Sequence, residues 1–190
     1  MKKSIIAIAV AAALAASADM KIGTVNMVQL VRLHPSHETN RNLIKSTDKD
    51  YKAKLDSRQD ALKTIADEGK KAQDDLNNPM LSAAAKAEAQ KKLEGVQQRF
   101  LAAQQDLRSA AQHYQNELSD LESRLLKLET EDIRAKITAY AKDNGFDLIL
   151  DASMLGYAKE SFDVTDDILK ALGVDPKKRK EKEEKKDAGK

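Results

Sequence analysis

The stretch LNNPMLSAAA, residues 76–85, joins two long runs of helical periodicity and decides the fold. Asn77, Asn78 and Pro79 form a turn signal, because proline disfavours helix in the residue before it. Ser82 is a good N-cap for the run that follows. We therefore predict a turn at about residues 77–81, between helices over residues 38–77 and 82–143.

Outward from this turn, apolar residues recur at steps of three and four, once Asp48, Arg58 and Gly69 are counted as positions of the first run. In the first run they are Ile44, Tyr51, Leu55, Leu62, Ile65, Ala72 and Leu76. In the second they are Ala85, Ala89, Leu93, Val96, Phe100, Ala103, Leu107, Ala110, Tyr114, Leu118, Leu121, Leu125 and Leu128. This rhythm is typical of coiled coils. Two such seams joined by a tight turn predict an antiparallel coiled-coil hairpin over residues 38–143.

The two seams also predict a register, because the numbers of facing residues in an antiparallel pair have a constant sum. The predicted pairs include Leu76/Ala85, Gly69/Leu93, Tyr51/Ala110 and Ile44/Leu118. Arg58 and Gly69 weaken the seam. This weakness is either ordinary for a coiled coil or a compliance that lets the arm fit different partners.

The flanks of the hairpin predict a small β body from residues 19–37 and 144–172. Strands are expected at residues 20–25, 146–152 and 155–158, a short helix at 27–33, and a last helix at 166–172 capped by Thr165. Beyond Leu118 the second helix has no partner left in the first, yet it stays apolar through Tyr140. Surplus apolar surface and open strand edges predict a homo-oligomer. The residues expected in this body are Ile22, Val25, Leu148, Leu150, Ile168 and Leu169.

The N-terminus has the pattern of a secretory signal peptide. Lys2 and Lys3 precede an uncharged run over residues 5–16, and Ala16-Ser17-Ala18 suits cleavage after Ala18. The alternative is an uncleaved membrane anchor, but the run is shorter than the roughly 20 residues that span a bilayer. We expect residues 1–18 to be removed and the protein to be exported.

Composition excludes several classes of protein. Among 190 residues there is no Cys and no Trp, and aromatic residues make up 4%. These figures exclude a disulfide scaffold and a thiolate zinc site, and they argue against a large enzyme core. The balanced charge of the exported chain does not suggest a nucleic-acid binder.

No pattern of catalytic or cofactor-binding residues stands out. The chain has neither a glycine-rich phosphate loop nor a nucleophile elbow. His34 and His37 are three residues apart, but Pro35 lies between them and no Cys is available as a further ligand. We therefore expect no enzyme, no catalytic residue, no cofactor and no metal site.

The hairpin tip carries the candidate binding residues. Its lysines outnumber its acidic residues and could attract acidic substrates or lipid headgroups, or could simply form a solvated surface. Met80 and Leu81 at the turn either touch a substrate or cap the hairpin. The set is Lys70, Lys71, Met80, Leu81, Lys86, Lys91 and Lys92.

Three segments make the chain resemble the Skp/OmpH family of periplasmic chaperones. They are KIGTVNM at residues 21–27, FDLILDA at 146–152 followed by Gly156-Tyr157, and DVTDDILKAL at 163–172. The resemblance implies a periplasmic homotrimer with a small β body and three helical tentacles around a cavity. It also implies an ATP-independent holdase that binds unfolded outer-membrane β-barrel proteins.

Two other classes of protein stay open. One is a structural coiled coil that tethers layers of the envelope. The other is a module that binds anionic lipid through the tip lysines and the basic tail. We expect that tail, residues 173–190, to be disordered; its alternative role is contact with anionic lipid or peptidoglycan.

Overall fold

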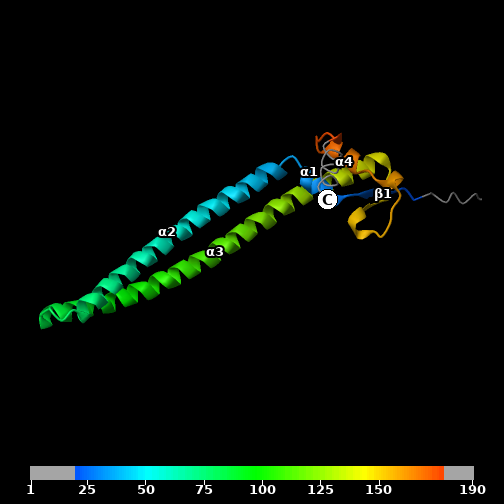
Figure 1. The fold of residues 1–190 in the computed structure, drawn as a ribbon. Helices are drawn as coiled ribbons and strands as arrows, with labels where there is room; N and C mark the ends of the chain where they lie inside the picture. Colours follow the sequence, from blue (N-terminus) through cyan, green and yellow to red (C-terminus); the bar gives the residue numbers. More distant parts are fainter. Residues whose placement is uncertain (1–19, 178–190) are drawn as a thin grey trace, which may run out of the picture.

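The computed structural model describes residues 20–177, which form a long arm and a small body (Figure 1). The elements follow the order β1 (Ile22–Val25), α1 (Met27–Leu33), α2 (His37–Asn77), α3 (Ala83–Asn144), β2 (Leu148–Asp151), 3-10 turns at Ala152–Met154 and Glu160–Phe162, and α4 (Thr165–Ala171). This confirms the predicted class, a mainly α chain with a helical hairpin on a small β body. The expected signal peptide and residues 178–190 of the expected tail lie outside the described residues.

The arm is the predicted hairpin of α2, with 41 residues, and α3, with 62. Ser82 caps α3, because its side chain accepts a hydrogen bond from the backbone nitrogen of Ala85 at 3.3 Å. Asn78 closes the turn by accepting from the backbone nitrogen of Met80 at 3.0 Å. Gly145 ends α3 in the left-handed conformation, with φ 66°, as glycine does at many helix ends. No helix within residues 20–177 has an apolar run long enough to cross a membrane.

The predicted register of the hairpin is wrong. Tyr51 stacks on Tyr114 rather than facing Ala110, and Gly69 lies against Val96 rather than Leu93. Both differences shift α3 in the same direction by about one helical turn. The predicted register set the end of α2 level with the start of α3. The observed pairs instead make the first turn of α3 extend farther from the body than the last turn of α2.

The body forms around two parallel strands. Ile22 of β1 lies opposite Leu148 of β2, and Val25 lies opposite Asp151. Parallel neighbours need a crossover connection, and here that connection contains the whole arm. The arm is therefore an insertion between two strands that pair at its base.

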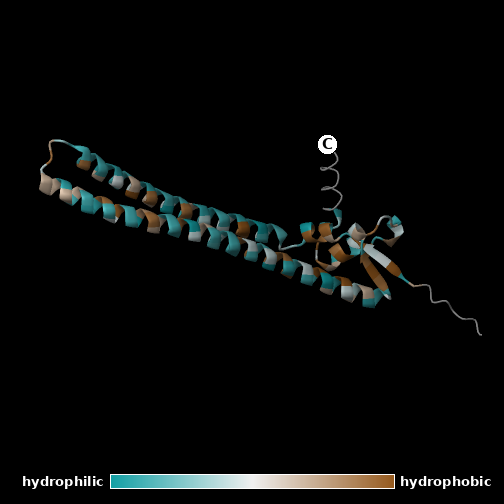
Figure 2. Cartoon of the chain, turned by 90° about the horizontal axis from the view of Figure 1, so that it is seen from below, coloured by the Kyte–Doolittle hydropathy of each residue, from teal (hydrophilic) through white to brown (hydrophobic). Residues whose placement is uncertain are grey.

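The core of the body lies where the end of α3 meets α1 and α4. Leu30, Ile133, Ile168 and Leu169 are fully buried there. Figure 2 shows apolar residues gathered in the body and scattered along the arm. The expectation that α3 lacks a partner in α2 beyond Leu118 is wrong. With the shifted register, the start of α2 lies beside Glu129 of α3, because His37 contacts Glu129. The body core begins four residues later, at Ile133.

The strand expected at residues 155–158 does not form. The side chain of Asp151 accepts from the backbone nitrogen of Ser153 at 3.0 Å and turns the chain into the 3-10 turn Ala152–Met154. The second neighbour of β1 is instead an isolated parallel bridge between Thr24 and Asp163.

Thr165 is not the N-cap of the last helix. α4 already begins at Thr165, and the carboxylate of Asp163 accepts from the backbone nitrogen of Thr165 at 2.9 Å. The Thr165 hydroxyl instead accepts from the backbone nitrogen of Asn26 at 2.9 Å. It therefore ties α4 to the segment between β1 and α1.

The tail begins later than the expected residue 173. Gly173, with φ 76°, donates to the Lys170 carbonyl, and Val174 donates to the Leu169 carbonyl. This pair of bonds is a Schellman motif, which turns the chain back at a helix end. Val174 is thereby buried in the body core.

Candidate functional site

The arm is held by a thin seam and by polar contacts across it. Above the joint with the body, the buried residues of α2 and α3 are Ala72, Ala89 and Val96. The rings of Tyr51 and Tyr114 are parallel, with centroids 4.4 Å apart. The Tyr51 hydroxyl donates to the Glu117 carboxylate at 2.6 Å, and this bond raises the pKa of Tyr51. The arm is therefore joined by shallow contacts rather than by a core.

Two ion pairs cross the arm on its surface. Arg58 Nε lies 3.0 Å from Asp106, and Arg99 lies 2.5 Å from Glu68. The hydrogen bond from Arg99 holds the pKa of the Glu68 carboxyl below its usual range. All four side chains are exposed, so each pair contributes little to stability.

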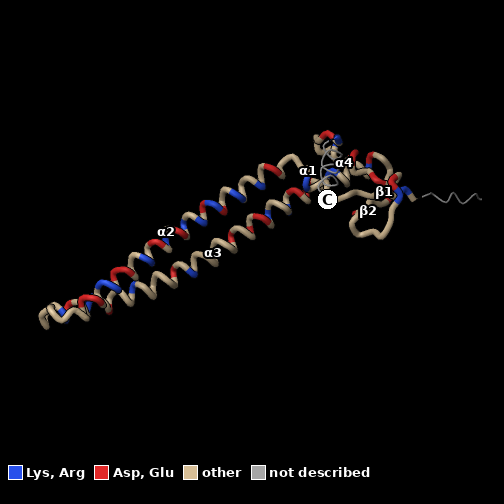
Figure 3. The backbone as a smooth tube through the Cα atoms, viewed as in Figure 1, with Lys and Arg blue, Asp and Glu red and all other residues tan. Residues whose placement is uncertain are grey.

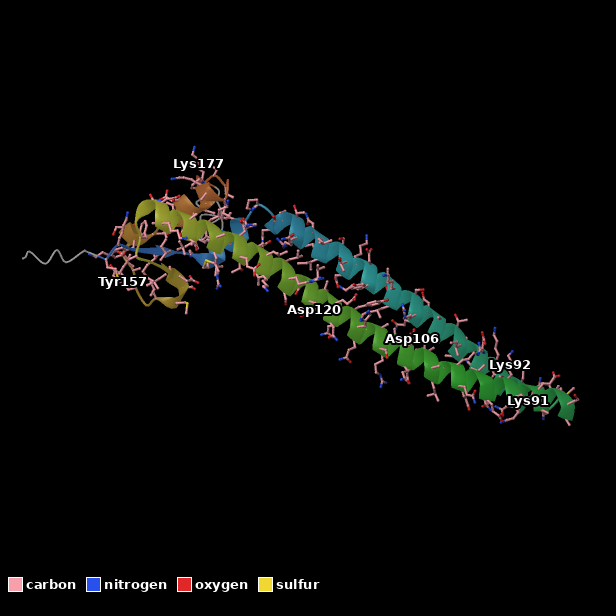
Figure 4. The ribbon with its side chains drawn as sticks, turned by 180° about the vertical axis from the view of Figure 1, so that it is seen from behind. Lys91, Lys92, Asp106, Asp120, Tyr157 and Lys177 are labelled. Carbon is pink, nitrogen blue, oxygen red and sulfur yellow. The ribbon has the colours of Figure 1, made fainter. Side chains whose placement is uncertain are left out.

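The structure brings the predicted tip residues to the far end of the arm, away from the body. Lys70 and Lys71 are on α2, Lys86, Lys91 and Lys92 are on α3, and the last two are labelled in Figure 4. Met80 is 89% exposed, whereas Leu81 is half-buried. Met80 therefore remains a candidate contact residue, and Leu81 partly covers the end of the hairpin.

Farther along the arm, an apolar groove of about 380 Å³ opens between the helices. Sequence reasoning missed it because it depends on the true register, which sets Gly69 against Val96. A Cβ atom at position 69 would lie 3.1 Å from Val96 Cγ1, which is a tight contact, so any larger residue there would require Val96 to shift. The groove is lined by Ala66, Gly69, Leu93, Val96, Gln97, Phe100 and Leu101.

At the joint between arm and body, two histidines pair with two carboxylates of α3. His34 Nε2 lies 3.1 Å from Asp132, and His34 Nδ1 accepts from the backbone nitrogen of Ser36. His37 Nδ1 lies 3.3 Å from Glu129. Glu129 is 4% exposed and also accepts from Asn40 at 2.8 Å.

At this joint, His34 and His37 each lie beside a carboxylate of α3. Within residues 20–177 no group of three or more His, Cys, Asp or Glu side chains is placed to hold one. Sequence spacing could not reveal the joint, because the partners lie more than 80 residues apart. What the joint does is tie the start of α2 to α3, just above the body core.

The predicted body residues divide between core and surface. Val25, Ile168 and Leu169 are buried within a single chain, so they can support an oligomer only through the shape of the body. Ile22 and Leu150 are half-buried, and Leu148 is 42% exposed on β2.

Further exposed apolar residues lie before β1 and after β2 in the sequence. Met20 lies two residues before β1, and the others follow β2, where Tyr157 is labelled in Figure 4. They are Met20, Met154, Tyr157 and Phe162. Exposed apolar side chains are the material of an interface with another chain.

Two side chains that hold α4 on the body, Asp167 and Tyr140, also have a shifted pKa. Asp167 accepts from Lys170 Nζ at 2.8 Å and from the Tyr140 hydroxyl at 3.0 Å. The Lys170 bond is the main cause that lowers the pKa of Asp167. Burial, and then the bond to Asp167, raise the pKa of Tyr140.

Comparison with known families gives one match, and it covers both arm and body. Residues 21–172 match the family described as OmpH, outer membrane protein (OmpH-like). A comparison with curated individual proteins found no match. The matched range begins one residue before β1 and ends just after α4.

Proposed function

Because the chain belongs to the OmpH-like family, a family of chaperones for outer membrane proteins, we propose that it is an ATP-independent holdase of the periplasm. It binds unfolded outer-membrane β-barrel proteins and prevents their aggregation. The single observation that supports this most is the arm, a long hairpin with exposed apolar side chains and no deep core.

The shape of the arm suits a partner without a fixed structure. An unfolded barrel strand alternates apolar and polar side chains and aggregates in water. Exposed residues such as Leu43, Met80 and Leu101 offer shallow apolar contacts along the arm. Many weak contacts on linked arms give a high overall affinity without a pocket for any one sequence. Binding of the unfolded state then competes with aggregation by mass action.

We also propose that the protein works as a homotrimer, as the family resemblance implies. The support is the body, where Leu148 of β2 and the neighbouring Met154 and Tyr157 are exposed. A two-stranded sheet leaves edges that further strands can cover. Three bodies packed through this surface would bring three arms around one cavity.

The test is the dilution of a urea-unfolded outer-membrane barrel protein into buffer that contains the exported chain and no nucleotide. Light scattering reports aggregation, and an equal mass of an inert protein is the control. Suppression that saturates near one oligomer per barrel protein supports the proposal. Scattering equal to that of the control contradicts it.

A second candidate function is binding to anionic lipid, which the lysines at the tip favour. Lys91 and Lys92 are adjacent and exposed, and Lys70 and Lys71 lie on the opposite helix. Cosedimentation with vesicles of anionic and of neutral lipid tests this function. If binding to the anionic vesicles persists when residues 177–190 are deleted, the tip is responsible; if binding disappears, the tail is.

A further inference from the structure

The two helices of the arm differ in charge where they face one another. Between Arg99 and Glu117, the only lysine, arginine or acidic residues of α3 are Asp106 and Arg108. The part of α2 alongside, residues 49–65, carries Lys49, Asp50, Lys52, Lys54, Asp56, Arg58, Asp60 and Lys63. Figure 3 shows the dense charge on α2 and the sparser charge on α3. The middle of α3 therefore offers the less strongly hydrated surface.

Four exposed residues of α3 share one side of the helix at this place. Gln97, Leu101 and Gln105 follow one another at steps of four, and Gln104 lies three residues after Leu101, so all four lie on one side of the helix. We call them the glutamine face: Gln97, Leu101, Gln104 and Gln105. In the described part of the chain, none of the three amides has a hydrogen-bond partner. Each is free to both donate and accept.

Two charged residues of α3 border this face, one at each end. Glu94 lies one turn before Gln97 and accepts a hydrogen bond from Gln90 at 3.0 Å. Arg108 lies one turn beyond Gln104. Arg99 and Asp106, which lie between them along the helix, pair with Glu68 and Arg58 of α2, so the face stays neutral between its two ends.

The glutamine face opens into the apolar groove at Gly69. Gln97 and Leu101 belong to both, and the rest of the groove is formed by apolar side chains and glycine, including Val96 and Phe100. Leu101 is 65% exposed and stands at the rim. A partner on this surface would thus meet neutral amides along α3 and an apolar space of about 380 Å³ beside them.

We propose that the glutamine face and its groove bind an extended segment of unfolded polypeptide, with one apolar side chain in the groove. This inference rests on the proposed function and names the site on the arm. An unfolded chain exposes backbone N–H and C=O groups, which neutral amides can pair without the cost of desolvating a charge. The face is about 12 Å long, which is roughly the length of four extended residues.

Other occupants fit this surface less well. An anionic headgroup needs cations in the groove, and none of the residues that line it is a lysine or an arginine. A second hairpin needs a continuous apolar seam, whereas Leu101 is followed on this face by Gln104 and Gln105. The combination of one apolar space and several neutral amides matches a single extended chain.

The experiment uses a ten-residue acetylated peptide of alternating leucine and threonine with one phenylalanine, and ¹³C-methyl NMR of the full protein. We expect saturable shifts at the methyl groups of Leu93, Val96 and Leu101, and none at Leu128. Leu101→Gln should weaken peptide binding about threefold to tenfold, because it removes an apolar rim. Leu128→Gln is the matched control, since Leu128 is 62% exposed on the same helix and lies roughly 40 Å away.

The same variants in the aggregation assay separate this inference from the proposed function. If the wild type suppresses aggregation but the groove methyls do not shift, the holdase stands and the groove site is overturned. If the groove methyls shift and Leu101→Gln weakens binding, the site stands whether or not aggregation is suppressed. Equal weakening by Leu101→Gln and Leu128→Gln also overturns the site.

Discussion

The body and the arm contain similar apolar side chains but bury them to different depths. In the body, Leu30, Ile133, Ile168 and Leu169 are fully buried. On the arm above the joint, the buried residues are two alanines and one valine, namely Ala72, Ala89 and Val96. Because apolar stabilisation grows with the area removed from water, the body is the more stable region. The arm can therefore change shape while the body keeps its fold.

The largest expected effect comes from breaking the core of the body. Ile168→Ala should lower the free energy of unfolding by about 2–5 kcal/mol, since it leaves a cavity among fully buried side chains. Urea unfolding followed by circular dichroism measures this change. Val28→Ala is the control, because Val28 also lies in the body but is 67% exposed. Similar losses from both variants would mean that the body has no distinct core.

A smaller effect is expected at the joint, where the two regions meet. Glu129→Ala leaves the polar groups of His37 and Asn40 without their acceptor, which should cost about 1–3 kcal/mol. Hydrogen exchange should then become faster at the start of α2, over residues 37–44, while the body stays protected.

The control for the joint is Glu131→Ala on the same helix. Glu131 is exposed and pairs only with Lys127, at 3.8 Å along the helix. Its removal should leave the exchange of residues 37–44 unchanged. If both variants speed this exchange equally, the contacts of Glu129 do not hold the arm to the body.

Much of the fold could be predicted because its signals are local. The turn at Asn78 and Pro79, the cap at Ser82 and the stop at Gly145 each act within a few residues, and all three are found as expected. The strands β1 and β2 and the short helix at Met27–Leu33 follow from equally local patterns, whereas the strand expected at residues 155–158 does not form.

The register and the groove could not be predicted from the same patterns. A rhythm of threes and fours fits several registers that differ by one turn. What selects among them is contact between distant residues, such as the Tyr51–Tyr114 stack and the approach of Val96 to Gly69. The predicted tip residues lie near the turn because the position of the turn does not depend on the register, and their role in binding stays a prediction.

The arm offers a third test, with a smaller effect than the first two. Tyr114→Leu keeps an apolar side chain in the seam but removes the stacked ring, which should cost about 0.5–1.5 kcal/mol. Hydrogen exchange of residues 48–58 should become faster, and the body should not change. Tyr157→Leu is the control, since Tyr157 is 82% exposed on the body. Faster exchange in the body with Tyr114→Leu would contradict the independence of the two regions.

The smallest expected effects come from two carboxyl groups with a lowered pKa, Asp167 on the body and Glu68 on the arm. Asp167 should make the stability of the body depend on pH. The pKa of Asp167 is lowered, chiefly by Lys170, so its folded value lies below its unfolded value. Its stabilising contribution is therefore present above about pH 4 and is lost as the pH falls through the lowered pKa. The side chain is partly exposed, so the loss should be below about 1 kcal/mol. Wild type and Asp167→Asn should differ in urea unfolding at pH 6, and the difference should shrink as the pH falls below about 4.

The carboxyl of Glu68 sharpens the comparison, because Arg99 lowers its pKa in the same direction on the exposed arm. The two carboxylates are about equally exposed, since the side chain of Glu68 is 39% exposed and that of Asp167 is 43% exposed. Raising the salt concentration should thus weaken the effect of Glu68→Gln on hydrogen exchange of the arm and the effect of Asp167→Asn on urea unfolding to a similar degree. If salt abolishes only one of the two effects, the two ion pairs are not screened alike, and the body and the arm differ in electrostatics as well as in apolar burial.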